Sequence, residues 1–101
     1  MIVTNVPQGS YGDCVKQVAE VAQRLGSKQV LRLVLGSVDS RCNVQEIKQL
    51  RHQAEMLKQG LAGMVLRVTP SITTEWAPSS SGHYSYQVYL DLERHKIRSV
   101  A

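Results

Sequence analysis

Two stretches of the chain decide its fold: Val30-Leu31-Arg32-Leu33-Val34-Leu35 and Met64-Val65-Leu66-Arg67-Val68-Thr69. Successive side chains of a strand point to opposite faces, so each stretch has an apolar side and a side that carries one arginine. An unpaired charge is very costly to bury, and we therefore expect the side with the arginine to lie outside the core. The pattern predicts a sheet with one covered face and one open face.

Two amphipathic helices supply the cover for this sheet. The first is expected to run from a capping pattern at Ser10 to Gly26, and the second from a capping pattern at Asn43 to Gly60 and Gly63. Between these limits apolar residues recur at helical spacing, which predicts one buried side on each helix.

Two further strands are expected over residues 1–6 and 83–92, which gives the order β-α-β-α-β-β. This order predicts an α+β fold, a two-layer sandwich in which a four-stranded mixed sheet carries both helices on one face. The 101 residues are expected to form a single domain. Prolines and serines between the last two strands predict a long loop over 70–82, which holds Trp76.

Composition indicates a soluble globular protein, with 43% hydrophobic and 20% charged residues. No apolar run approaches the roughly 20 residues that span a bilayer, and the first residues lack the pattern of a secretory signal. Cys14 and Cys42 have no metal-binding spacing and are expected to be structural, reduced thiols. We therefore predict a cytoplasmic protein without a membrane partner.

No catalytic motif is evident in the sequence. His52, His83 and His95 have no carboxylate or nucleophile at motif spacing, so we expect no catalytic residue, no metal and no cofactor. The turn Pro7–Gly12 precedes a helix and could hold a phosphate on free backbone amides, but it lacks the lysine of a P-loop. The chain is predicted to be a non-enzymatic binding module.

The formal net charge of +4 favours an anionic partner, and the basic residues are unevenly spread along the chain. Arginine and tyrosine on an open sheet face are ingredients of nucleic-acid recognition. The residues expected to contact RNA or DNA are Arg32, Arg41, Lys48, Arg51, Arg67, Tyr89, Arg94, Lys96 and Arg98.

A second interpretation makes the chain a protein-interaction adaptor or inhibitor. It would dock through the open sheet face, with Gln87, and through Trp76 on the loop. A mixed apolar and polar sheet face is also typical of two-fold dimers, so we expect a homodimer.

The layout, size and basic balance resemble the Alba-like nucleic-acid-binding domains, and also the C-terminal domain of the third bacterial translation initiation factor. The segments that match best are Ile2–Pro7 leading to Tyr11, and Leu35–Arg41 leading into the second helix. The resemblance implies RNA or DNA binding, with Arg41 as a phosphate contact. Two departures are that Gln8-Gly9-Ser10 holds no lysine and that 70–82, the family's basic hairpin arm, holds no lysine or arginine.

Overall fold

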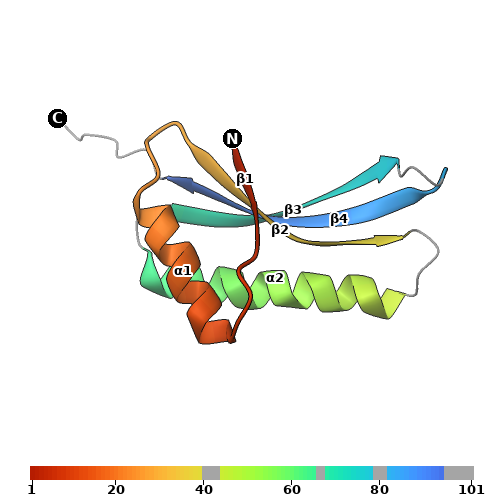
Figure 1. Ribbon diagram of the computed structural model, residues 1–101, viewed down its shortest axis with the longest axis horizontal. Helices are drawn as coiled ribbons and strands as arrows, with labels where there is room; N and C mark the ends of the chain where they lie inside the picture. The colour runs from red at the N-terminus through yellow and green to blue at the C-terminus, as the bar shows by residue number, and fades with distance from the viewer. Residues whose placement is uncertain (40–43, 66–67, 79–81, 95–101) are drawn as a thin grey trace.

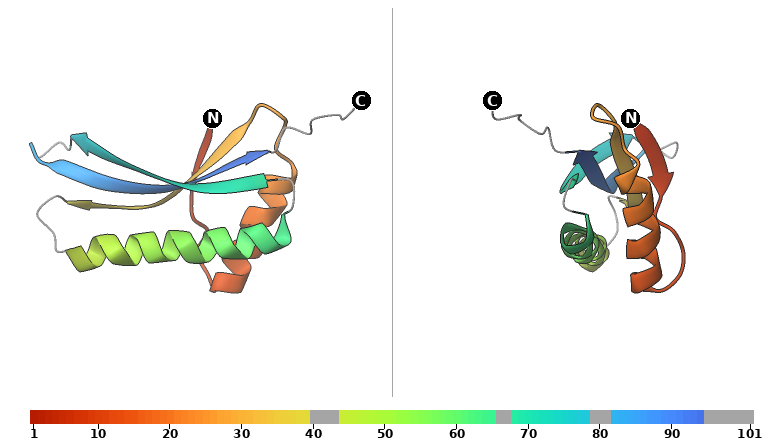
Figure 2. Two further views of the ribbon diagram at one scale, coloured as in Figure 1. Left: turned by 180° about the vertical axis from the view of Figure 1, so that it is seen from behind. Right: turned by 90° about the vertical axis from the view of Figure 1, so that its left-hand side faces the viewer.

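The computed structural model describes residues 1–39, 44–65, 68–78 and 82–94. Its elements are β1 (Ile2–Asn5), α1 (Tyr11–Gln23), β2 (Val30–Asp39), α2 (Val44–Met64), β3 (Val68–Pro78) and β4 (Tyr84–Arg94). The strands form one sheet in the order β1-β2-β4-β3, in which only β1 and β2 are parallel. Both helices lie on one face of this twisted sheet (Figures 1 and 2), so the predicted two-layer α+β fold is confirmed.

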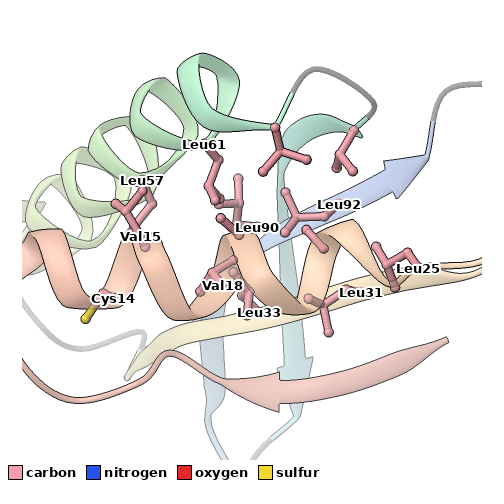
Figure 3. Close-up of a cluster of buried hydrophobic side chains, with 14 residues drawn as sticks. Cys14, Val15, Val18, Leu25, Leu31, Leu33, Leu57, Leu61, Leu90 and Leu92 are labelled. Carbon is pink, nitrogen blue, oxygen red and sulfur yellow. The ribbon is translucent and has the colours of Figure 1, made fainter.

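The core lies between the sheet and the two helices (Figure 3). Leu31 and Leu33 of β2 pair across the ladder with Leu92 and Leu90 of β4, and all four side chains are buried. The remaining buried side chains of this cluster come from the helices, from residues just after each helix and from the start of β3. They are Cys14, Val15, Val18, Ala19, Ala22, Leu25, Leu57, Leu61, Val65 and Val68.

The predicted cap of α1 is present. The Ser10 hydroxyl accepts a hydrogen bond from the backbone N–H of Asp13 at 3.3 Å and donates one to the Asp13 carboxylate at 2.9 Å. Where α1 crosses α2, the Tyr11 hydroxyl donates to the carbonyl of Met56 at 2.6 Å. A Cβ on Gly60 would lie 2.5 Å from that hydroxyl oxygen, so a larger residue at position 60 would require the Tyr11 side chain to shift.

The strand predicted over Met64–Thr69 begins later, at Val68, because α2 continues to Met64. Leu57, Leu61 and Val65 recur at four-residue spacing and are all buried, and the Val65 N–H bonds to the Leu61 carbonyl at 2.8 Å. This helical spacing competes with the two-residue alternation of the same stretch and prevails, since it places Val65 in the core.

The long loop predicted over 70–82 is wrong. Most of that segment belongs to β3, which pairs with β4 without interruption from Val68 opposite Arg94 to Pro78 opposite Tyr84. β3 is an edge strand, where a proline such as Pro70 costs no ladder hydrogen bond on its solvent side. The β-branched run Ile72-Thr73-Thr74 favours a strand, and this preference outweighs the turn signal of the prolines.

β2 also extends beyond the predicted end at Gly36, to Asp39. A register shift between Val34 and Gly36 changes which alternate residues face the helices, so Val38 is buried while Ser37 is exposed. No helix within the described part of the chain is long and apolar enough to cross a membrane.

Candidate functional site

The open face of the sheet is held together by an ion pair at its centre. Arg32 on β2 donates to both carboxylate oxygens of Asp91 on β4, from Nε at 2.8 Å and from one terminal nitrogen at 3.0 Å. Thr73 on β3 donates to the same carboxylate at 2.8 Å. The side chains of Arg32 and Asp91 are only 21% and 14% exposed, so this bidentate pair links the three strands in a half-buried setting.

Tyr89 lies beside this pair on the same face. The guanidinium carbon of Arg32 is 4.5 Å from the centre of the Tyr89 ring, in cation–π geometry. The Tyr89 hydroxyl donates to the Glu75 carboxylate at 3.3 Å and is also hydrogen-bonded to Gln87. Arg32, Tyr89 and Gln87, which the sequence predicts on the open face, therefore each have a hydrogen-bond partner within the chain.

The titration of these groups reflects the same pairing. Hydrogen bonds from Arg32 lower the pKa of the Asp91 carboxyl, although burial opposes them. The hydrogen bond to Asp91 raises the pKa of Arg32. Burial raises the pKa of Tyr89, and the neighbouring Glu75 carboxylate adds to the effect. A phosphate on this face would have to displace Asp91 from Arg32.

The open face is acidic over the described residues. Strand alternation and pairing place one arginine there, Arg32, against the four carboxylates Asp39, Glu75, Asp91 and Glu93. Arg67, predicted to add a second positive charge, lies outside the described residues, as do Arg41, Lys96 and Arg98. Over the described residues, the charges of this face thus disfavour a polyanion.

Trp76 and Gln87 do not share a surface. Trp76 pairs with Tyr86, and both alternate in step with Ile72 and Leu90, which face the helices. Gln87 lies one residue on from Tyr86 and therefore belongs to the open face. The adaptor surface that was expected to combine them is divided between the two faces of the sheet.

Three unpaired cations of the described residues line a groove between α2 and β3, which we call the α2/β3 groove. Its volume is about 620 Å³. Charged side chains recur every three or four residues along one side of α2 and form one wall, while β3 forms the other. The lining residues are Lys48, Arg51, His52, Glu55, Lys58, Ser71, Ile72 and Thr74.

The cations of this groove differ from Arg32 in their surroundings. Within the described residues, the side chains of Lys48, Arg51 and Lys58 have no hydrogen bond and no ion pair within 4.0 Å. Glu55 is the one carboxylate of the lining, which leaves a formal excess of two positive charges. The groove is therefore open to an anion that makes several contacts at once.

Two of these cations, Lys48 and Arg51, were predicted site residues, whereas the β3 wall was not foreseen. The wall was missed because its residues were assigned to a loop. The alternation of Ile72, Thr74 and Trp76 was the available signal. Another predicted contact, Arg94, instead donates to the backbone carbonyl of Leu25 at 3.1 Å, next to the end of α1.

A second cavity, of about 550 Å³, lies beside the start of α1 and is mostly apolar. The Cys14 thiol in its wall donates to the Pro7 carbonyl at 2.8 Å. Ser10 caps the helix and Asp13 brings a negative charge into its first turn, so this end does not suit a phosphate. Over the described residues, no three metal-ligating side chains gather at one place.

No protein-family model, curated protein or solved structure matches this sequence. The resemblance to Alba-like domains stays a prediction from layout.

Proposed function

We propose that this protein is a non-enzymatic nucleic-acid-binding module that holds a sugar–phosphate backbone in the α2/β3 groove. The observation that carries the proposal is the set of cations Lys48, Arg51 and Lys58, which line one groove and have no partners among the described residues. Thr74 lies on the same side of β3 as Ile72, and its hydroxyl in the same lining can donate to a phosphate oxygen.

The distribution of charge favours this surface over the open sheet face. Among the described residues, a polyanion approaching the open face meets four carboxylates and an arginine already bound to Asp91. In the groove it meets an excess of positive charge. Phosphates held by lysine and arginine release condensed counterions, so affinity should fall steeply as salt rises. Homodimerisation and a cytoplasmic location remain predictions.

The test measures fluorescence anisotropy of labelled RNA and DNA oligonucleotides over a salt series. The triple variant K48Q/R51Q/K58Q should lose at least about tenfold in affinity and flatten the salt dependence. The matched control K16Q/R24Q/K28Q removes the same charge from exposed positions on and after α1, away from the groove lining. It should retain most of the affinity.

Two results would overturn the proposal. One is a wild-type protein that binds no oligonucleotide at low salt. The other is an equal loss in both triple variants, which would mean that only net charge matters and that the groove is no site.

A further inference from the structure

We infer that the α2/β3 groove takes single-stranded rather than duplex nucleic acid, with one base stacked on the Trp76–Tyr86 pair. This inference rests on the proposed function and adds the class of nucleic acid. It starts from Trp76, which is 54% exposed although it belongs to a paired strand. An exposed tryptophan there has no role in the buried core.

Trp76 lies on β3 just beyond the residues that line the groove. Ile72 and Thr74 line the groove, and Trp76 is the next residue of β3 on the same side, about 7 Å further along the strand. β3 ends at the end of the molecule where α2 begins (Figures 1 and 2), which is the end of α2 that carries Lys48. At that end the β3–β4 hairpin diverges from α2 (Figures 1 and 2), so the aromatic ring lies beyond the lined part of the groove, on the same side of β3 as Ile72 and Thr74.

The ring is held in place by its neighbour across the strands. The centres of the Trp76 and Tyr86 rings are 4.9 Å apart and their planes are tilted by 58°. Tyr86 is half-buried and packs against the indole, while more than half of the Trp76 surface stays exposed. A ring that already packs against a neighbour loses less conformational entropy when a base stacks on it.

The accessibility of the bases favours single-stranded over duplex nucleic acid. Bases inside a duplex are stacked on each other, and their faces are not available to a protein ring, whereas the bases of a single strand are. A line of cations that ends in an exposed aromatic ring is the combination that single-stranded nucleic acid uses, with phosphates on the cations and a base on the ring. An acidic peptide could use the cations but offers no base for Trp76.

The experiment uses the fact that Trp76 is the only tryptophan of the chain, so its emission reports directly on this position. Wild-type protein is titrated with a 12-residue oligothymidine, and binding of the labelled form is followed in parallel by anisotropy. We expect saturable quenching of Trp76 with the same midpoint as the anisotropy change. Trp76→Ala should weaken binding about 5- to 100-fold, and Trp76→Phe should restore most of it.

Two competitors separate the sources of affinity. A duplex of equal length and a polyglutamate of equal charge should each displace the labelled oligothymidine at least tenfold less well than the unlabelled single strand. If either competes as well as the single strand, the inference is overturned. It is also overturned if anisotropy reports groove-dependent binding while Trp76 emission and the Trp76→Ala affinity stay unchanged, a result that leaves the proposed function standing. Absence of any anisotropy change would instead refute the proposed function itself.

Discussion

The open sheet face and the α2/β3 groove both carry an arginine, which is paired with a carboxylate on the open face and, within the described part of the chain, unpaired in the groove. On the open face Arg32 is fixed by two hydrogen bonds to Asp91 and lies against the Tyr89 ring. In the groove Arg51 and its neighbours Lys48 and Lys58 have no such partner among the described residues. The fold thus uses the charge of Arg32 internally and leaves the charge of Arg51 available to a ligand.

The largest effect on stability is expected from breaking the ion pair. Arg32→Gln leaves the half-buried Asp91 carboxylate without its charged partner, so the free energy of unfolding should fall by about 1–3 kcal/mol in urea denaturation. Oligonucleotide affinity, measured by anisotropy under conditions where the variant is folded, should not change. Arg51→Gln is the matched control and should do the reverse, with stability altered by less than about 0.5 kcal/mol. A folded Arg32→Gln protein that loses binding would move the site to the open face.

The same pair gives the stability a defined dependence on pH. The Asp91 pKa is lower in the fold than its ordinary value of 3.8, because Arg32 stabilises the carboxylate. Its contribution is therefore present above pH 3.8 and is lost as the pH falls through 3.8 toward the folded pKa. Urea midpoints of the wild type should fall more steeply between about pH 5 and about pH 2 than those of Asp91→Asn. Parallel curves would show that the pair contributes nothing to stability.

A third comparison uses adjacent threonines on opposite faces of β3. Thr73 donates to Asp91 at 2.8 Å on the open face, whereas Thr74 lies in the groove lining. Thr73→Val removes this hydrogen bond at nearly constant shape and should lower the free energy of unfolding by about 0.5–1.5 kcal/mol. Thr74→Val should leave stability nearly unchanged, and equal losses in both variants would mean that Asp91 does not depend on Thr73.

Much of the architecture was accessible from the sequence because local signals agree with the fold. The Ser10 cap, the helical stripe through Val15 and Val18, and the alternating leucines of β2 each specify one element and one buried side. Burial of these apolar sides against one another leaves two layers as the stable arrangement.

What could not be predicted depends on contacts between distant segments. The alternation 64–69 and the helical spacing of Leu57, Leu61 and Val65 are both legible in the sequence, and only packing decides between them. The partner of Arg32 is 59 residues away, so no local pattern shows that its charge is already used. The groove was hidden for the same reason, since β3 becomes its wall only through pairing with β4.

The smallest effect is expected from one cation of the groove, and it tests whether Lys48 belongs to the line that leads to Trp76. A lysine that holds one phosphate of a single strand contributes about 0.7 to the slope of log affinity against log salt. Lys48→Gln should reduce the slope for oligothymidine by about this amount, so that the curves of variant and wild type converge as salt rises. Lys16→Gln, an equal change at an exposed position of α1, should give a curve parallel to the wild type. If Lys48→Gln is also parallel, no phosphate lies at Lys48, and the path from the groove to the Trp76 ring is interrupted there.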